Sequence, residues 1–240
     1  MINAILLSYC VSNSNTPIFQ GGYELKIIGM FGWEQTDLCI YLASILENMG
    51  YHVLVIDNSR EETMDCCIPK PKQELHTVTY KNVDYRRHLT VHLWKDEAYD
   101  FIIVDLGNQI SGEEAALCDE LFFVTSCDRR NLENAKDIML GMKRPMGVII
   151  RNFCSDTLRP ERILATLESE NCFVMERFLL PFHVGDESVR VRMQYEGYDG
   201  ICHISKALER MLFTICSMLT QREAHFVIQG IRRAKKGECY

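Results

Sequence analysis

The stretch KIIGMFGWEQTDLCIYLASILENMGYHVLVIDNS, Lys26 to Ser59, decides the fold class. Its apolar pattern predicts a buried strand over LKIIGMF, a helix from about Thr36 to Met49, and a second buried strand over YHVLVID. Gly50 is well placed to end the helix. A short polar turn, GWEQT, joins the first strand to the helix, and this turn decides what the fold can bind.

Strands and helices continue to alternate along the chain. The segments that read as strands are YDFIIVD, ELFFVTS, MGVIIRNF and FVMERFLLPF, the last leading into a loop. The segments that read as helices are EEAALCD, RNLENAKDIMLGMK, RPERILATLESEN and GICHISKALERMLFTICSMLTQ. This order predicts a single α/β domain with a mostly parallel, doubly wound sheet and helices on both faces. We assign residues 25–220 to this domain, 1–24 to an N-terminal edge strand or hairpin, and 221–240 to a basic amphipathic tail.

Composition narrows the functional classes. The formal net charge of −7 argues against broad nucleic-acid binding, which needs an excess of Lys and Arg. The eleven cysteines are scattered without a CxxC pair or zinc-finger spacing, which is typical of reduced core thiols in a cytoplasmic protein. No apolar run approaches the length of a membrane-spanning helix, and the first residues make a poor signal peptide. We therefore expect a soluble, cytoplasmic protein.

Two aspartates stand at the ends of apolar strands. Asp57 closes VLVID and Asp105 closes FIIVD. In open α/β sheets, ligands bind beyond the carboxyl ends of the strands, where a carboxylate can hold Mg²⁺. The structural alternative is that each aspartate caps the turn or helix that follows. The presence of two favours descent from a metal–nucleotide site.

Six segments, in the same order, resemble the ParA/MinD family of P-loop ATPases, the group with the deviant Walker A motif. They are KIIGMF, LCIYLASILENMGYHVLVID, YDFIIVDLGNQIS, CDELFFVTSCDRRNLENAKDIM, GVIIRNF and LLPFHVGDESVRVRMQYEG. Within the family, VDLGNQIS and CDELFFVTSCDRRNLENAK look most like the TadZ/CpaE pilus-assembly branch. The resemblance implies a P-loop NTPase-like fold, ATP and Mg²⁺ as family ligands, and dimers that normally form around the nucleotide.

The turn departs from the family's phosphate loop, which reads KGGxGKT. Aligned on the helix, Thr36 matches the Mg²⁺-binding threonine, Gln35 the Walker lysine and Glu34 the preceding glycine. The signature lysine has no counterpart, and the turn is about four residues short. Keeping instead the general GxxxxGKT length, from Gly29 to Thr36, places Gly29 inside the strand and still lacks the final glycine and lysine.

These departures weaken phosphate binding. Glu34 would stand where phosphate sits, and two like charges at ~4 Å repel by about 4 kcal/mol at an effective dielectric near 20. A lost lysine contact removes ~1.5–3 kcal/mol more. Together these terms lower nucleotide affinity by orders of magnitude. The second strand of the family usually ends Asp-x-Asp, but here Ser59 follows Asp57, so the residue that helps position water is missing.

The resemblance assigns a vestigial nucleotide site to eight residues: Gly32, Trp33, Glu34, Gln35, Thr36, Asp57, Asp105 and Asn152. Asn152 matches the family's adenine-recognising asparagine, although as a single residue it is equally a turn residue. Trp33 either plugs the vacated pocket, meets a partner or is an ordinary surface aromatic. His88 and His92 would share a helix face with Asp84 and Asp96 if a helix formed there; ion pairing explains that spacing better than a metal site.

The C-terminal tail has two interpretations. Phe226, Val227, Ile231 and Ala234 would share one face of a helix, flanked by Arg222, Arg232, Arg233, Lys235 and Lys236. Such a helix either lies on an anionic membrane, as in MinD-like relatives, or docks on the body with a solvated basic end. Gly230 weakens it as a helix.

The leading hypothesis is a non-hydrolytic ParA/MinD-like scaffold or positioning factor, in pilus or secretion assembly. It would act as a homodimer with protein partners, peripheral contact at the inner face of the membrane and no nucleic acid, and it would need no cofactor. The alternative is an ATPase with a rebuilt site, in which Thr36 and Asp105 hold Mg²⁺, Asp57 assists, and a cation comes from elsewhere, for instance Arg129 or Arg130. A third hypothesis is a membrane-recruited regulator that works through its tail.

Overall fold

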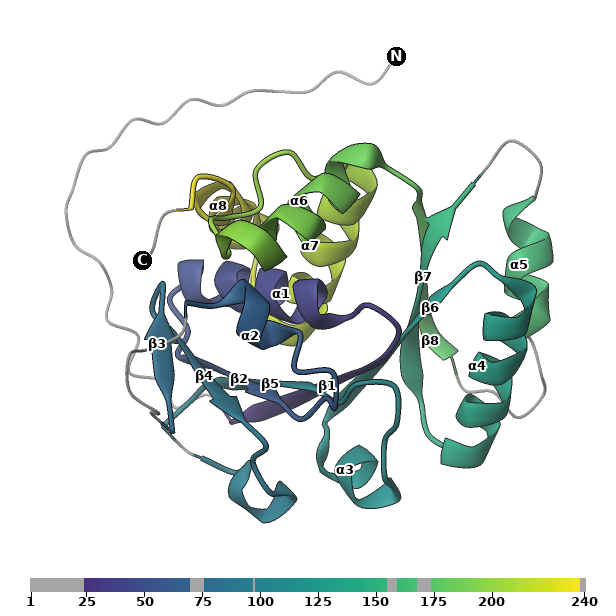
Figure 1. The fold of residues 1–240 in the computed structure, drawn as a ribbon, viewed down its shortest axis with the longest axis horizontal. Helices are drawn as coiled ribbons and strands as arrows, with labels where there is room; N and C mark the ends of the chain where they lie inside the picture. The colour runs from purple at the N-terminus through teal and green to yellow at the C-terminus, as the bar shows by residue number, and fades with distance from the viewer. Residues whose placement is uncertain (1–23, 70–75, 97, 155–158, 168–173, 238–240) are drawn as a thin grey trace.

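The computed structural model describes residues 24–69, 76–96, 98–154, 159–167 and 174–237, and within these ranges one eight-stranded sheet runs through the molecule (Figure 1). The spatial order of its strands is β3-β4-β2-β5-β1-β6-β7-β8. The strands are β1 (Lys26–Gly32), β2 (Val53–Asp57), β3 (Val78–Tyr80), β4 (Val83–Arg87), β5 (Phe101–Asp105), β6 (Glu120–Ser126), β7 (Met146–Phe153) and β8 (Val174–Pro181). All neighbouring pairs are parallel except β3 and β4. The predicted α/β fold class is confirmed; the predicted N-terminal hairpin lies outside the described residues, apart from Glu24.

Helices cover both faces of the sheet. They are α1 (Thr36–Asn48), α2 (Met64–Cys67), α3 (Gly112–Leu117), α4 (Arg129–Met142), α5 (Pro160–Leu167), α6 (Val184–Glu196), α7 (Lys206–Thr220) and α8 (Ala224–Lys235), with one 3₁₀ turn, η1 (Val91–Leu93). Successive side chains of β1 enter different cores because a strand alternates its faces: Ile28 packs with α1, α6, α7 and α8, and Ile27 with α3, α4 and α5. Figure 1 shows α1, α6, α7 and α8 grouped over one side of the sheet, with α4 and α5 beside β6 to β8.

Helix α1 is buried along its whole length, which is unusual for a helix that packs on a sheet. One face lies on the strands, and the opposite face is covered by α7 and α8. Residues outside the predicted apolar face, among them Ile40 and Tyr41, are therefore also buried. This packing places the first turn of α1 just beyond the carboxyl end of β1.

Helix α8 forms within the segment predicted to be a tail, and it docks on the body. Val227, Ile231 and Ala234 are buried in the same core as α1. Phe226, which was predicted to share that face, is exposed instead, and that prediction is wrong. Gly230 lies where α8 meets α1: an added Cβ would come within 2.5 Å of Met49 Cγ. No helix in the described ranges combines the length and apolar character that crossing a bilayer requires.

Two segments differ from the sequence-based expectation. Helix α6 was expected to be a loop, because its charged and polar residues outweigh the apolar ones. In the structure the segment is helical, and only Val189 and Met193 of it are buried. The segment after residue 83 was expected to allow a helix, but Asp84 lies in β4, whose alternating burial follows a strand period. His92 lies in η1, so His88 and His92 do not share a helix face.

Candidate functional site

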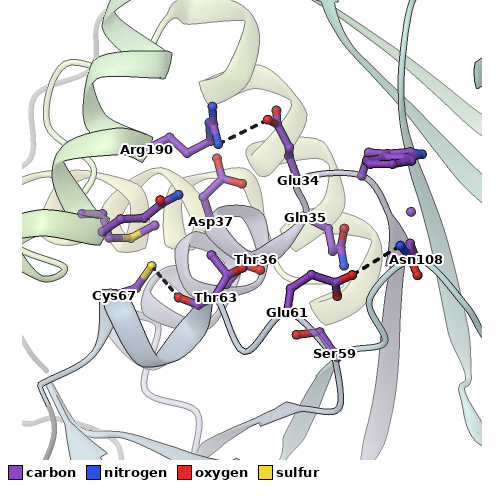
Figure 2. A pocket seen from close by; sticks show the side chains of 14 residues that line it. Glu34, Gln35, Thr36, Asp37, Ser59, Glu61, Thr63, Cys67, Asn108 and Arg190 are labelled. Atoms are coloured by element: carbon purple, nitrogen blue, oxygen red, sulfur yellow. Dashed lines mark hydrogen bonds and ion pairs between the residues drawn. The ribbon is translucent and has the colours of Figure 1, made fainter.

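A cavity of about 340 Å³ opens beside the carboxyl end of β1, between α1, α2 and α6 (Figure 2). Five predicted site residues line it: Gly32, Trp33, Glu34, Gln35 and Thr36. Its other lining residues are Asp37, Ser59, Glu61, Thr63, Cys67, Asn108, Arg190, Met193 and Gln194. The position agrees with the rule that ligands bind beyond the carboxyl ends of parallel strands.

The turn between β1 and α1 is short, and the backbone N–H groups at its start are already bonded within the chain. It consists of the three residues Trp33, Glu34 and Gln35. The backbone N–H of Gly32 donates to the carbonyl of Gly107 at 2.7 Å, and that of Trp33 donates to the carbonyl of Val124 at 3.0 Å. A phosphate loop works by pointing such N–H groups at the ligand. Here the N–H groups of Gly32 and Trp33 instead bind the start of the turn to the segment after β5 and to β6.

Gly32 is required by this close approach. Its φ is +120°, and an added Cβ would lie 1.9 Å from the carbonyl oxygen of Val124. No side chain fits there. The glycine is therefore explained by packing of the turn on β6, without a ligand.

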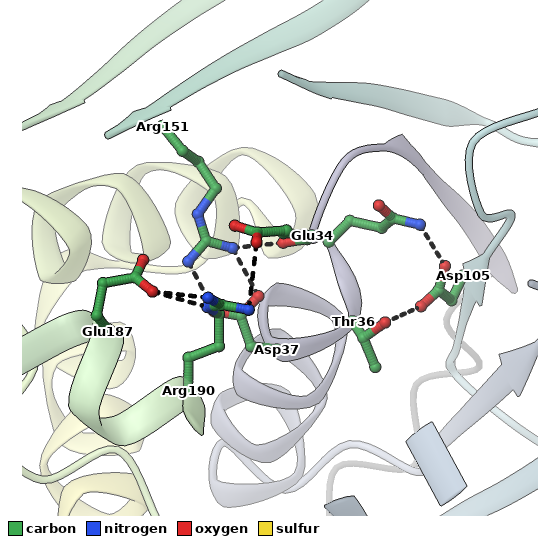
Figure 3. Close-up of polar contacts among 8 residues, drawn as sticks. Glu34, Thr36, Asp37, Asp105, Arg151, Glu187 and Arg190 are labelled. Atoms are coloured by element: carbon green, nitrogen blue, oxygen red, sulfur yellow. Dashed lines mark hydrogen bonds and ion pairs between the residues drawn. The ribbon is translucent and has the colours of Figure 1, made fainter. Parts of the chain in front are cut away.

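Asp105 lies behind the turn and is fully buried. Its Oδ2 accepts a hydrogen bond from Thr36 Oγ1 at 2.6 Å, and its Oδ1 accepts from Gln35 Nε2 at 2.6 Å and from the backbone N–H of Gly107 at 3.0 Å (Figure 3). Burial raises the pKa of Asp105, and the three hydrogen bonds oppose that rise. The two groups proposed for Mg²⁺ are thus in contact, and Asp105 also joins the turn to β5.

Asp57 lies beside Asp105 in the sheet register but does not line the cavity. Its Oδ1 accepts hydrogen bonds from the Ser59 backbone N–H at 2.9 Å and the Ser59 hydroxyl at 2.6 Å. Burial raises its pKa to about 6, against the opposing effect of the Ser59 hydrogen bonds. Ser59 therefore serves Asp57 as a hydrogen-bond donor.

A buried ion pair holds the first turn of α1. Arg151, near the end of β7, donates from Nη1 to Asp37 Oδ1 at 2.7 Å and from Nη2 to Oδ2 at 2.9 Å. The side chains of Arg151 and Asp37 are 5% and 2% exposed. Arg151 also donates to the backbone carbonyl of Glu34. Burial lowers the pKa of Arg151, but Asp37 more than reverses that effect, so the guanidinium stays charged.

A second arginine fixes the side chain of Glu34. Arg190, on α6, lies 2.7 Å from Glu187 Oε2 and 3.4 Å from Glu34 Oε1. Glu34 has a φ of +56°, a left-handed backbone conformation that residues other than glycine seldom adopt. The contacts of Arg151 and Arg190 hold it there (Figure 3).

Sequence reasoning assigned no role to these two arginines. The available signal for Arg151 was a charged residue inside the apolar strand MGVIIRNF, which has to be paired if it is buried. Arg190 gave no comparable signal, because α6 itself was not predicted. Arg129 and Arg130, suggested as a cation source, lie in the first turn of α4 and do not line the cavity.

Three other predicted features lie apart from the cavity or fill it only in part. Asn152, with a φ of +59°, does not line the cavity, and its carbonyl accepts a contact from Cys127 Sγ at 3.3 Å. Trp33 lines the cavity but is 55% exposed, so it forms a wall without plugging the space. Most of the predicted tail residues belong to α8, whereas Arg222 precedes it and Lys236 follows it, and none of them lines the cavity.

The chemistry of the cavity fits a cation better than a phosphate. Among the described residues, three carboxylates line it, Glu34, Asp37 and Glu61, against one guanidinium, Arg190, and no lysine. The Thr36 hydroxyl and the Asp105 carboxylate are oxygen donors of the kind that Mg²⁺ uses. Within the described ranges, no group of three or more His, Cys, Asp or Glu side chains is arranged to hold a metal.

Comparison with solved structures identifies the fold. The chain is similar to a ParA family ATPase from Chlorobium tepidum TLS (TM-score 0.54, 14% identity, covering 87% of this chain and 98% of the other). It is equally similar to a chain of the MinC:MinD cell division protein complex of Aquifex aeolicus (TM-score 0.54, 16% identity, 87% and 95%). A third is a putative plasmid partition protein from Borrelia burgdorferi B31 bound to AMPPNP (TM-score 0.51, 13% identity, 88% and 99%). No family model matches the chain, and no curated protein matches its sequence. The chain therefore has the ParA/MinD P-loop NTPase fold.

Proposed function

We propose that the protein is a non-hydrolytic scaffold or positioning factor that keeps the ParA/MinD frame and has lost the phosphate loop. One observation carries the proposal: where β1 passes into the three-residue turn, the N–H groups of Gly32 and Trp33 donate to the carbonyls of Gly107 and Val124. These two amides are not available to a phosphate, and the turn has no lysine, so it lacks much of what a P-loop uses to bind phosphate. The acidic lining adds repulsion to this loss.

The work of such a protein is done by its surfaces. We propose that it dimerises without nucleotide and recruits protein partners, with no role for nucleic acid given its net charge of −7. The resemblance to the TadZ/CpaE branch suggests pilus or secretion assembly as the setting, in the cytoplasm and near the inner face of the membrane. Because Val227, Ile231 and Ala234 are buried, any membrane contact of α8 would have to use its exposed basic side.

A Mg²⁺-dependent ATPase is the second candidate. It is favoured by the 2.6 Å contact between Thr36 and Asp105, which joins the two family positions that hold Mg²⁺. These residues fit the ion, but the turn does not favour the triphosphate, since the Glu34 carboxylate lines the cavity and the Gly32 and Trp33 amides are bonded elsewhere. We therefore rank this candidate second.

Calorimetric titration with Mg-ATP and Mg-ADP tests the proposal. We expect no binding heat from the wild-type chain at nucleotide concentrations up to about 1 mM, under conditions where an active ParA family ATPase binds. Asp105→Ala is measured in parallel, with Asp105→Asn as the more conservative variant because Asp105 accepts three hydrogen bonds. Wild-type binding that both variants abolish would establish a working site of a new kind and overturn the proposal.

A further inference from the structure

Not all the cysteines belong to the core. The structure describes eight of the eleven, all of them as free thiols. Four of these are buried, as the sequence suggested, and the other four reach the surface at least in part: Cys66, Cys127, Cys154 and Cys202. A thiol at the surface is open to exchange and oxidation, whereas a buried structural thiol is inert.

Cys127 and Cys154 come from neighbouring strands and meet at one carbonyl group. Cys127 directly follows β6, and Cys154 directly follows β7. The two strands are parallel neighbours, with Ser126 beside Arg151 in the register. Both thiols contact the backbone oxygen of Asn152, Cys127 Sγ at 3.3 Å and Cys154 Sγ at 3.8 Å. Because they share this acceptor, the two sulfurs cannot be further apart than the sum of these distances.

The Cys127 sulfur also lies against the backbone of Cys154 itself. Burial raises the pKa of the Cys127 thiol, and a hydrogen bond from the Cys154 backbone N–H opposes that rise. Cys127 therefore already contacts the residue to which it would bond. The Cys154 side chain is exposed, so it has room to rotate about its Cα–Cβ bond and bring its sulfur toward that of Cys127.

The two thiols differ in access, which gives them different parts in an exchange reaction. Cys154 is exposed, whereas Cys127 is half-buried. A small disulfide in solution therefore meets Cys154 first. Cys127 is placed to attack the product of that first step, because it lies beside the Cys154 sulfur.

We propose that Cys127 and Cys154 form a reversible disulfide by exchange with a low-molecular-weight disulfide. The Cys154 thiolate attacks one sulfur of that molecule, forms a mixed disulfide and releases the other half as a thiolate. The Cys127 thiolate then attacks the Cys154 sulfur, closes the protein disulfide and releases the second half. Each half leaves with the electron pair of the broken S–S bond and takes up a proton from a protein thiol. The protein thus loses two electrons and two protons to the small disulfide.

The new bond would enclose α4 and β7 in a covalent loop and fix the carboxyl ends of β6 and β7 to each other. Ligands of open α/β sheets bind at this edge, so the bond would modify the face that a partner or ligand meets. In a reducing compartment such a disulfide forms only under oxidising conditions, which is the behaviour of a redox sensor. The inference does not depend on the proposed function, since it holds whether or not the cavity binds a nucleotide.

Glutathione buffers of graded oxidation test the proposal on the full-length, fully reduced protein. After acid quenching and alkylation of the remaining thiols, cleavage after Glu120 separates Cys127 from Cys118, and mass spectrometry identifies the linked peptides. We expect a single linked pair, Cys127 with Cys154, that dithiothreitol opens again.

The same titration in urea supplies the reference. A disulfide that the fold favours stabilises the fold by the same factor. We expect the folded chain to form the bond at a value of [GSSG]/[GSH]² about a hundredfold lower than the unfolded chain requires.

Three variants separate the two steps. Cys127→Ser should stop the reaction halfway and leave glutathione on Cys154, whereas Cys154→Ser should leave Cys127 as a free thiol. Cys66→Ser, which removes an exposed thiol on α2, is the matched control and should leave the linkage unchanged. Three results would overturn the inference: equal oxidation of the folded and unfolded chains, a stable glutathione adduct on Cys154 of the wild type, or a bond from Cys154 to a different cysteine.

Discussion

At the scale of single residues, the pairing of Arg151 with Asp37 makes the first turn of α1 depend on a buried charge. Removing one partner of such a pair leaves the other buried and uncompensated, which typically costs 3–5 kcal/mol. We predict that Arg151→Met lowers the free energy of unfolding by about that amount. We also predict that Arg151→Met with Asp37→Leu regains most of it, because the double variant buries no charge. Urea unfolding measures both.

The exposed pair between Arg129 and Glu133 on α4 is the matched control. Its side chains are largely in solvent, so Arg129→Met should change the unfolding free energy by less than about 0.5 kcal/mol. If Arg151→Met costs no more than Arg129→Met, the buried pair does not stabilise the first turn of α1.

Asp57 links the stability of the site to pH. Burial raises its pKa from 3.8 in the unfolded chain to about 6, so between these values the folded protein keeps a proton that the unfolded chain has lost. The stabilisation by this group is complete at low pH and is lost as the pH rises through about 6. Asp57→Asn does not titrate. We predict that the stability of Asp57→Asn relative to wild type rises between pH 4 and pH 7, by at most about 3 kcal/mol.

Urea unfolding of both proteins at several pH values checks this difference. Ser59→Ala removes the hydroxyl that opposes the pKa rise, so it should move the pH-dependent loss of stability to higher pH. A constant difference between wild type and Asp57→Asn across this pH range would show that Asp57 titrates alike in the folded and unfolded chain.

At the scale of elements, the contact between α1 and α8 depends on a missing side chain. In an exposed helix, Gly→Ala stabilises by about 0.5–1 kcal/mol. Gly230 is different, because an added Cβ would meet Met49 Cγ at 2.5 Å and the Ile45 carbonyl oxygen at 3.0 Å. We predict that Gly230→Ala destabilises the protein by about 1–3 kcal/mol, which is the usual cost of overpacking.

Gly141 in α4 is the control for this prediction. An added Cβ there has no heavy atom within 4 Å, so Gly141→Ala should raise the melting temperature while Gly230→Ala lowers it. Thermal unfolding followed by circular dichroism gives both values. Stabilisation by Gly230→Ala would mean that α8 does not pack closely on α1.

At the scale of the whole molecule, the fold was largely predictable and the site was predictable only in part. Strands buried in a parallel sheet read as continuous apolar runs, so β1, β2, β5, β6 and β7 were visible in the sequence. The pairing of Arg151 with Asp37 joins residues 114 positions apart, and no local pattern encodes it. The docking of α8 had a weaker signal: apolar residues of α1 outside its main face, such as Ile40 and Tyr41, needed a cover. Helix α6 could not be predicted from apolar periodicity, because only Val189 and Met193 of its residues are buried.

The last prediction concerns assembly. Helix α6 carries an exposed apolar stripe, Val184, Val191 and Tyr195, whose spacing puts all three on one face, with exposed Phe182 just before the helix. A surface of this kind is typical of an interface, and the proposed function requires association without nucleotide.

We predict a dimer in nucleotide-free solution at micromolar concentration, measured by analytical ultracentrifugation. Val191→Asp with Tyr195→Asp should weaken it at least about a hundredfold, because carboxylates would be buried unpaired. Phe226→Asp, on the exposed side of α8, should leave it intact. A wild-type chain that stays monomeric would contradict the prediction, and dimerisation that appears only with Mg-ATP would favour the ATPase instead.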